Sequence, residues 1–331
     1  MTHVVPELVG TLLAGVGLLF LGLEVLGNSL RPLATTRVRR LVGGWTGRPM
    51  VSGLVGVGAG ALLQSSTAIT FVLIGMVTSD VITVGNALPL VLWSNLGGTV
   101  PIFAALLDLH LVVLYVLGAT ALGLAFGRPR RHQHVLGAVF GVALVLHGVH
   151  LLGAGALPLR EAGWARALLA HTRDSSALAF LFGAGLAFVA QSSTAITIVA
   201  ITMTRTGVMV VDQTIMMIYG ANLGSALFKM VLNASLRGPA KQLARSQDMF
   251  KICCTLIFVP LFYLETLGGV PLVKALAARL AGPLEAQMAL VFVVLNLGTA
   301  LVMSPFLAPL EALMVRLYPS GPRGVAARDA A

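Results

Sequence analysis

A seven-residue sequence, QSSTAIT, occurs twice in this chain of 331 residues, at Gln64–Thr70 and at Gln191–Thr197. A second motif, NLG, follows at 95–97 and at 222–224, with the same shift along the sequence (191 − 64 = 222 − 95 = 127). Two polar clusters that recur at one fixed shift indicate an internal repeat, and a repeat constrains the fold more than any single motif does. We therefore interpret the chain as two homologous halves.

The composition is that of a polytopic membrane protein. Hydrophobic residues make up 57% of the chain and charged residues only 10%, whereas soluble domains usually carry about a quarter charged residues. Apolar runs of roughly 20 residues, which is long enough to cross a bilayer, recur along the whole sequence. The net charge of +10 comes from short arginine clusters between these runs, which is typical of cytoplasmic loops near anionic lipid rather than of nucleic-acid binding. The adjacent cysteines Cys253 and Cys254 predict neither a disulfide framework nor a metal site.

We predict an all-α membrane protein built from two inverted repeats. Each repeat has a spanning helix, a re-entrant hairpin that carries QSST, a broken helix that carries NLG, and a further span. A hairpin is favoured because polar, non-helical backbone survives at membrane depth only where protein buries it or a cavity lies beside it. The predicted segments are a first repeat (1–131; hairpin about 50–78, broken helix about 81–107), a second repeat (132–268; hairpin about 177–204, broken helix about 208–235), and a final span with a short basic tail (269–331).

The charged loops predict how the chain is oriented in the membrane. If each hairpin returns to the side from which it entered, each repeat crosses the membrane three times and the second repeat is upside down. With the N-terminus outside, the strongly basic stretches 31–48, 128–131 and 237–245 and the C-terminal tail all face the cytoplasm, as the positive-inside rule requires. The mixed-charge loop 159–176 then lies outside. We therefore expect a multi-pass protein of the plasma (inner) membrane with a cytoplasmic C-terminus.

The two QSST motifs are the candidate binding site. Helices that begin within the membrane offer free N–H groups to an anion, and helices that end there offer carbonyls to Na+. Serine, threonine, glutamine and asparagine side chains can donate or accept hydrogen bonds, so they can hold a charged substrate and a cation without a fixed charge. A lone Ser-Ser pair more often only packs helices. Two copies, each with NLG at matched spacing, favour a binding role.

These paired motifs, QSSTAIT…NLGGT and QSSTAIT…NLGSA, resemble the type II sodium-dependent phosphate cotransporter family, here in a short bacterial form. The resemblance covers roughly residues 10–306. It implies Na+-coupled symport of inorganic phosphate by alternating access, with phosphate and Na+ bound between the two hairpin tips near mid-membrane. The residues that it implies for binding substrate and ion are Gln64, Ser65, Ser66, Thr67, Asn95, Gln191, Ser192, Ser193, Thr194 and Asn222. Further candidates are Thr99, Ser225, Asp212 and Asn296.

One position departs from the family pattern. The last two helices of the family resemble one another, and here FKICCTLIF from Phe250 aligns with LNLGTALVM from Leu295 (295 − 250 = 45). Asn296 keeps the expected asparagine in the second copy, whereas Lys251 replaces it in the first. We interpret Lys251 as snorkelling to the membrane interface. The departure leaves the Na+ stoichiometry and the choice of phosphate over another oxyanion open.

Other functions fit the sequence less well. A passive channel needs a continuous polar lining, whereas the polar residues here are concentrated at the tips of the two predicted hairpins. An intramembrane hydrolase using Ser65 or Ser192 would need a GxSxG turn and a nearby base, and neither is present. His147 and His150 lie on one helix face and are interpreted as packing residues. We expect no enzyme activity, no cofactor other than Na+ as coupling ion, no nucleic-acid partner, no C-terminal regulatory domain, and a homodimer in the lipid bilayer.

Overall fold

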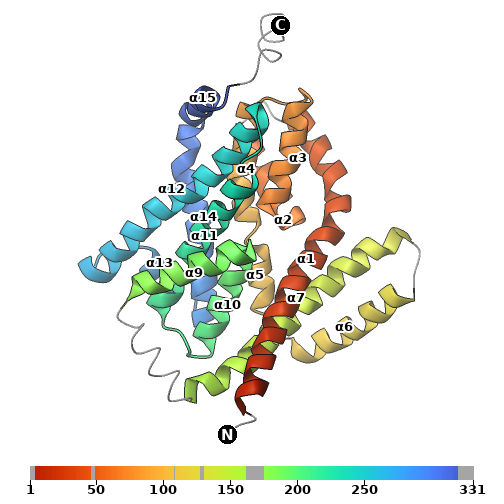
Figure 1. Cartoon of the computed structure of the whole chain (residues 1–331), viewed down its shortest axis with the longest axis vertical. Helices are drawn as coiled ribbons and strands as arrows, with labels where there is room; N and C mark the ends of the chain where they lie inside the picture. The colour runs from red at the N-terminus through yellow and green to blue at the C-terminus, as the bar shows by residue number, and fades with distance from the viewer. Residues whose placement is uncertain (1–3, 46–48, 108, 127–129, 162–174, 320–331) are drawn as a thin grey trace, which may run out of the picture. The chain divides into compact units, whose positions relative to one another are not determined.

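The computed structural model describes residues 4–45, 49–107, 109–126, 130–161 and 175–319. All regular secondary structure in these ranges is helical, which confirms the expected all-α fold (Figure 1). The helices are α1 (Val4–Trp45), α2 (Pro49–Leu63), α3 (Ser66–Thr78), α4 (Val84–Gly97), α5 (Val100–Ala105), α6 (His110–Ala125), α7 (Arg130–Glu161), α9 (Ser176–Ala190), α10 (Ser193–Arg205), α11 (Val211–Leu232), α12 (Gly238–Gly268), α13 (Val273–Leu280), α14 (Leu284–Met303), the 3-10 helix η1 (Ser304–Phe306) and α15 (Leu307–Leu317).

Six helical stretches in the described part of the chain are long and apolar enough to cross a membrane. These stretches are Pro6–Leu30, Val84–Ala105, Gln133–Pro158, Val211–Leu232, Gly238–Gly268 and Leu284–Leu317. The four helices beside the QSST motifs are apolar but only 13 or 15 residues long. A single helix needs roughly 20 residues to cross. Each of these four helices therefore reaches only part of the way across a bilayer.

Two pairs of short helices form helical hairpins around the QSST motifs. In the first hairpin, α2 and α3 pack together and are separated by Gln64 and Ser65. In the second hairpin, α9 and α10 pack together and are separated by Gln191 and Ser192. The helix breaks thus fall inside the two QSST motifs.

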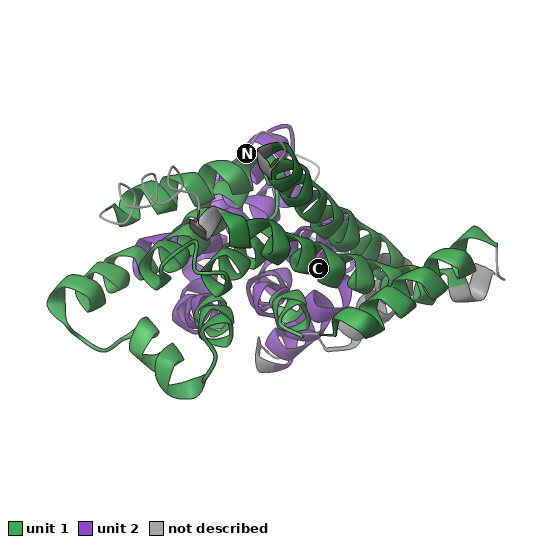
Figure 2. Cartoon of the chain, turned by 90° about the horizontal axis from the view of Figure 1, so that it is seen from below, with its two compact units in different colours: residues 1–33, 99–225, 258–294 green, residues 34–98, 226–257, 295–331 purple. Residues whose placement is uncertain are grey.

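Contacts divide the chain into two compact units, which Figure 2 colours separately. Unit 1 contains residues 1–33, 99–225 and 258–294, and unit 2 contains residues 34–98, 226–257 and 295–331. Each unit takes segments from both halves of the sequence. Unit 2 holds the first QSST hairpin, and unit 1 holds the second.

In unit 2, α2 and α4 pack closely because glycines face the neighbouring backbone. A Cβ atom at Gly56 would overlap the backbone of Leu90, and one at Gly97 would overlap the backbone of Val57. Small residues at helix contacts let backbones approach in this way. The α3 and α15 helices also pack against α4. The buried core of the unit extends from these helices to Phe250 of α12.

In unit 1, α9 and α11 meet through the equivalent residues. A Cβ at Gly183 would overlap the backbone of Met217, and one at Gly224 would overlap that of Ala184. Each of these positions lies 127 residues after its counterpart in unit 2 (183 − 56 = 217 − 90 = 224 − 97 = 127). The packing of a QSST hairpin against an NLG helix is therefore repeated residue for residue.

A second glycine contact in unit 1 joins α1 to α7. A Cβ at Gly15 would meet the carbonyl oxygen of Gly148, and one at Gly22 would meet that of Gly141. The two glycines of α7 follow those of α1 by one shift (141 − 15 = 148 − 22 = 126). Gly15 thus meets the counterpart of Gly22, and Gly22 meets the counterpart of Gly15. Reciprocity of this kind is what a two-fold relation between equivalent elements produces.

The second NLG helix differs from the prediction. We expected a broken helix over about 208–235, but α11 is continuous throughout its length. The first NLG segment is interrupted, because α4 ends at Gly97 and α5 begins at Val100. Pro101 lies beside that interruption and removes a backbone donor, whereas α11 contains no proline. The break in one copy is therefore a local effect of sequence.

Two predicted loops are also helical in part. The basic stretch 31–48 continues α1 as far as Trp45, and residues 46–48 lie outside the described part of the chain. Most of the basic stretch 237–245 forms the start of α12. Arginine and lysine favour helices, so a basic stretch next to an apolar span can extend that helix. Of the mixed-charge loop 159–176, residues 162–174 lie outside the described ranges.

Candidate functional site

The first QSST loop turns sharply at Gln64. This residue has a φ of 53°, in the left-handed region that residues other than glycine rarely occupy. Ser65 is extended, and its Oγ accepts a hydrogen bond of 3.2 Å from the N–H of Ala68. Ser65 is therefore the N-cap of α3. The motif sits at the positive end of a helix dipole.

The second QSST loop has the same local geometry. Gln191 has a φ of 59°, and Ser192 caps α10 by accepting a 3.2 Å hydrogen bond from the N–H of Ala195. Among the other non-glycine residues that the structure describes, only Asp80 has a positive φ. Backbone strain of this type tends to persist where function requires it. Its recurrence at one motif position in both units indicates that the motif needs this turn.

Each motif places neutral polar groups at a helix start. The first N–H groups of a helix have no intrahelical acceptor, and they favour a bound anion. Ser66 and Thr67 begin α3, and Ser193 and Thr194 begin α10. Ser193 is buried and the other three are half-buried. Neither motif contains a charged side chain. Binding at these loops therefore relies on hydroxyls, amides and backbone groups.

Gln64 carries an unsatisfied oxygen. Its Nε2 donates a 3.0 Å hydrogen bond to the carbonyl oxygen of Ala61, while its buried Oε1 has no hydrogen-bond partner. A buried polar atom without a partner costs free energy. Neutral carbonyl oxygens of this kind are the groups that coordinate Na+ in transporters. The structure therefore offers Gln64 Oε1 as a candidate cation ligand, whereas Gln191 is exposed.

The NLG asparagines lie on helices that pack against the hairpins. The Nδ2 of Asn95 donates 3.2 Å hydrogen bonds to the carbonyl oxygens of Val91 and Leu92 in its own helix. Asn222 is only 2% exposed in unit 1. The glycines of the two motifs, Gly97 and Gly224, provide the close helix contacts described above. Each unit thus brings one QSST hairpin against one NLG helix.

The four further candidates have different surroundings. Thr99 and Asn296 are buried in unit 1 and unit 2, respectively. The hydroxyl of Ser225 donates a 3.0 Å hydrogen bond to the carbonyl oxygen of the second NLG asparagine. Asp212 forms an ion pair, with its Oδ1 2.5 Å from Nζ of Lys274. A Na+ ion at Asp212 would have to compete with this lysine.

The last threonine of each QSSTAIT motif is a further candidate residue that the sequence did not single out. Thr70 is buried, and its hydroxyl lies 2.7 Å from Oε1 of Gln247 on α12, in unit 2. Its counterpart Thr197 is fully buried in unit 1, and its hydroxyl has no partner. The repeat itself was the signal, because both threonines belong to the repeated seven residues.

The interpretation of Lys251 as a snorkelling residue is wrong. Lys251 is only 7% exposed and lies inside unit 2 with Lys229 and Asp248. It looked interfacial because the basic stretch before it was expected to be a loop. Instead, α12 begins at Gly238, thirteen residues earlier (251 − 238 = 13), so Lys251 lies well inside the helix. An ionisable residue in that setting is a functional candidate.

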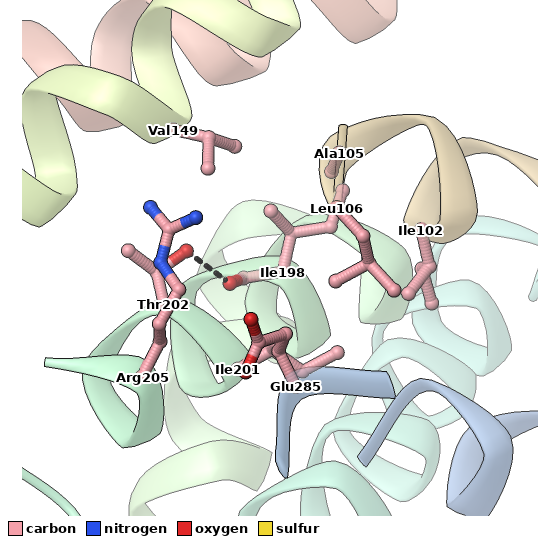
Figure 3. Close-up of a pocket in the computed structure, with 9 residues that line it drawn as sticks. All are labelled: Ile102, Ala105, Leu106, Val149, Ile198, Ile201, Thr202, Arg205 and Glu285. Carbon is pink, nitrogen blue, oxygen red and sulfur yellow. Dashed lines mark hydrogen bonds between the residues drawn. The ribbon is translucent and has the colours of Figure 1, made fainter. Parts of the chain in front are cut away.

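A small cavity in unit 1 is lined by no residue of either QSSTAIT motif (Figure 3). Its walls are mostly apolar, with Ile102 and Ile198 among them, and the side chains of Arg205 and Glu285 project beside it. About 10 Å³ of it is open to the centre of a water molecule, which is room for about one water. The cavity is too small for phosphate.

Three histidines border a second cavity of unit 1, together with Arg205. The rings of His110 and His150 stack with their centroids 3.9 Å apart. The Nδ1 of His147 is buried without a hydrogen-bond partner. No cluster of histidine, cysteine, aspartate or glutamate among the described residues is arranged to hold a metal ion. The packing role expected for His147 and His150 stays a prediction.

The six apolar stretches define the class as a multi-pass helical membrane protein. The sequence matches the model of the Na+/Pi-cotransporter family over residues 18–154 and 160–299. The chain therefore belongs to the Na+/Pi-cotransporter family.

Bacterial relatives share this sequence at moderate identity. YjbB of Escherichia coli (strain K12), whose name proposes inorganic phosphate export, is 28% identical over 305 residues, covering 90% of this chain and 54% of YjbB. YjbB of Salmonella typhimurium is 27% identical over 252 residues, covering 75% of this chain and 46% of that protein. The uncharacterized protein YqeW of Bacillus subtilis is 23% identical over 240 residues, covering 72% and 78%. The chain thus spans about half the length of the YjbB proteins. No solved structure matches significantly.

Proposed function

We propose that this protein is a secondary active transporter that moves inorganic phosphate across the plasma membrane together with Na+. The observation that carries the proposal is the shared geometry of the two QSST loops. Each loop has a left-handed glutamine, a capping serine and the N-terminus of a 13-residue helix. Two such loops in one chain offer an anion two positive helix ends without any fixed counter-charge in the motifs.

The hydroxyl group of each capping serine can still donate a hydrogen bond. In each loop the serine Oγ accepts a backbone N–H, which occupies a lone pair and leaves the hydroxyl hydrogen free to donate. Ser65 and Ser192 can therefore donate to a phosphate oxygen while they keep capping their helices. The oxygens of Gln64 and of the asparagines Asn95 and Asn222 are the complementary groups that we assign to Na+.

Alternating access follows from the repeats. We propose that the halves are inverted repeats and that the two loops hold phosphate and Na+ together near mid-membrane. The residue-for-residue repetition of the hairpin contacts supports two equivalent modules. The reciprocal contact of α1 with α7 supports a two-fold relation between them. If the two modules exchanged conformations, the site would open first to one side of the membrane and then to the other.

The direction of transport has a second candidate. The E. coli and Salmonella relatives carry names that propose phosphate export. Coupling to an inward Na+ gradient drives uptake, whereas export by the same site needs an outward gradient of the coupling ion or a phosphate gradient. We favour Na+-coupled symport, with direction set by the gradients.

The deciding test is radiolabelled phosphate transport in proteoliposomes. With an inward Na+ gradient, uptake should rise above its equilibrium level and then decline as the gradient dissipates. Replacement of Na+ by choline should abolish this overshoot. Downhill flux that ignores Na+ would favour a passive channel. If folded protein moves no phosphate, the same assay with sulfate and arsenate tests the alternative of another small anion.

A matched pair of serines tests the site. Ser175 caps α9 as Ser192 caps α10, accepting an N–H at 3.3 Å, but lies outside the motif. Both Ser175→Ala and Ser192→Ala should destabilise the fold by about 1 kcal/mol. Only Ser192→Ala, and likewise Ser65→Ala, should lower phosphate uptake by about tenfold or more, because each loses a hydrogen bond to a charged ligand. Equal uptake by all three variants would contradict the assignment.

A further inference from the structure

Buried charge in the described part of the chain is concentrated at one place. Only three charged side chains with described burial are less than a tenth exposed, and all three lie in unit 2. Lys229 of α11 is 8% exposed, and Asp248 and Lys251 of α12 are 1% and 7% exposed. The aspartate interacts electrostatically with both lysines. These residues sit in two of the apolar spans, where ionisable side chains are rare and usually functional.

The charges in this cluster do not balance. Arg245 adds a third cation, with Nη1 3.3 Å from Oδ2 of Asp248 and Nη2 2.9 Å from the carbonyl oxygen of Met230. Three cationic side chains against one carboxylate leave a formal excess of two positive charges. The second carboxylate oxygen, Oδ1 of Asp248, is buried and has no hydrogen-bond partner. A network that served only to hold helices together would be expected to balance its charges, because an excess of buried charge is costly.

The cluster is connected to the first QSST motif. Gln247 precedes Asp248 on α12, lies four residues from Lys251 and is 2% exposed. Its amide oxygen contacts the hydroxyl of Thr70, the last residue of QSSTAIT, at 2.7 Å. The other end of the amide, Nε2, is buried without a partner. Besides its lysines, the cluster thus has an amide nitrogen without a partner, on a residue of α12 that contacts the first hairpin.

The sign of the excess charge selects the ligand. A Na+ ion beside Asp248 would meet three cations, so this carboxylate is unsuited to binding the coupling ion. An anion, in contrast, would neutralise the excess and accept hydrogen bonds from ammonium and amide groups. Lysine commonly binds phosphate as a point charge, and its long side chain can turn toward a ligand.

We propose that Lys229, Lys251 and Gln247 form an oxyanion-binding site beside the first QSST hairpin, and that inorganic phosphate occupies it during transport. This inference rests on the proposed function. It adds two lysine side chains to a site that the sequence motifs describe as free of ionisable groups. It also makes the two hairpins unequal, because the equivalent threonine of the second hairpin, Thr197, has no such partner.

The repeated segments of the chain suggest which substitution to test at Lys251. Lys251 and Asn296 are equivalent in the pair of similar segments at 250–258 and 295–303 (296 − 251 = 45). The two segments are neighbours in unit 2, since Sγ of Cys254 lies 3.7 Å from the carbonyl oxygen of Leu295. Lys251→Asn therefore installs the residue that the second segment already carries. Lys241 is the control, because it is a half-buried lysine on the same helix, bonded to the carbonyl oxygen of Ala234.

Equilibrium binding of radiolabelled inorganic phosphate to the purified protein is measured first, followed by uptake. Lys251→Asn and Lys229→Met should each weaken phosphate affinity by about tenfold or more, the usual effect of losing a hydrogen bond to a charged group. The Na+ concentration for half-maximal uptake should not change. Thermal stability should be kept or raised, because an unbalanced buried charge is removed. Lys241→Asn should bind phosphate like the wild type.

A variant that removes the negative charge of the cluster distinguishes an electrostatic role from a structural one. Asp248→Asn raises the formal excess from two to three positive charges and should tighten phosphate binding severalfold. If the network is purely structural, Asp248→Asn and Lys251→Asn will both lose folded protein or leave affinity unchanged, and the inference is wrong. Wild-type binding and uptake by the lysine variants would also overturn it while the proposed function stands. Failure of the wild type itself to bind or transport phosphate would overturn both.

Discussion

At the scale of single residues, the two motif glutamines are held in a conformation that their type disfavours. The left-handed region costs roughly 1–2 kcal/mol for residues with a Cβ, and glycine would avoid that cost. Gln64 and Gln191 nevertheless occupy it in both units. The turn alone would select glycine, so we expect the recurring glutamine side chain to be needed for binding.

Replacing these glutamines by glycine should separate stability from transport. Gln64→Gly and Gln191→Gly should leave the free energy of unfolding unchanged or raise it by up to about 1 kcal/mol, since the strain is relieved. Phosphate uptake should fall, because the amide groups are lost. Asp80→Gly, at a φ of 56° outside the motif, is the control and should retain uptake. Normal uptake by the two glutamine variants, measured beside thermal unfolding, would show that only the turn matters.

At the scale of helices, glycine contacts set how each hairpin is held. Gly97 and Gly224 face the backbone of a neighbouring helix, where a Cβ would overlap. Gly58 and Gly185 lie on the hairpin helices α2 and α9, again 127 residues apart (185 − 58 = 127), and a Cβ there meets nothing within 4 Å. Each pair of a hairpin helix and an NLG helix (α2 with α4, and α9 with α11) thus carries glycines with opposite expectations.

Alanine substitution should reveal this difference in both units. Gly97→Ala and Gly224→Ala should lower the free energy of unfolding by about 1–3 kcal/mol or more, since the neighbouring backbone must shift. Gly58→Ala and Gly185→Ala should stabilise by up to about 1 kcal/mol, because alanine is the better helix former. Thermal unfolding of the four purified variants provides the comparison. Similar stabilities for all four would mean that the helices do not pack this closely.

Much of the fold could be predicted at this scale, because repeat, apolar length and motif position are local properties of sequence. The helix breaks at Gln64 and Gln191 fell where the motifs placed them. The continuity of α11 could not be predicted, since the interruption of the first copy depends on a nearby proline. The cluster of Lys229, Asp248 and Lys251 was also missed, because it forms only when α11 and α12 pack together, and no spacing in the sequence encodes that contact.

At the scale of the whole molecule, one short helix decides on which side the C-terminus lies. Six long spans alone would return the chain to its starting side. A seventh crossing by α6, which three crossings in each repeat require, would place the termini on opposite sides. With 16 residues α6 is about 24 Å long, a little short of the roughly 30 Å hydrocarbon core. The basic residues that follow at 128–131 favour a crossing that ends in the cytoplasm.

Reporter fusions on both sides of α6 test this topology. A fusion to alkaline phosphatase after Leu107 should be active, because that point should lie outside. Fusions to green fluorescent protein after Phe126 and after the last residue should fluoresce, because both points should be cytoplasmic. If the fusions after Leu107 and Phe126 report the same side, α6 does not cross, and the C-terminus lies on the same side as the N-terminus.

The reciprocal glycine contact between α1 and α7 bears on how such a chain could have arisen. Gly15 meets Gly148, and Gly141 meets Gly22, so the surface that each helix presents is complementary to itself. Before the gene duplicated, a half-length ancestor with this surface would have associated with an identical copy through the same glycines. Fusion of the two genes would then have joined an existing homodimer into one polypeptide. Mutations confined to one half, such as those that introduced the buried lysines, would have required the duplication, because a single gene gives both copies the same sequence.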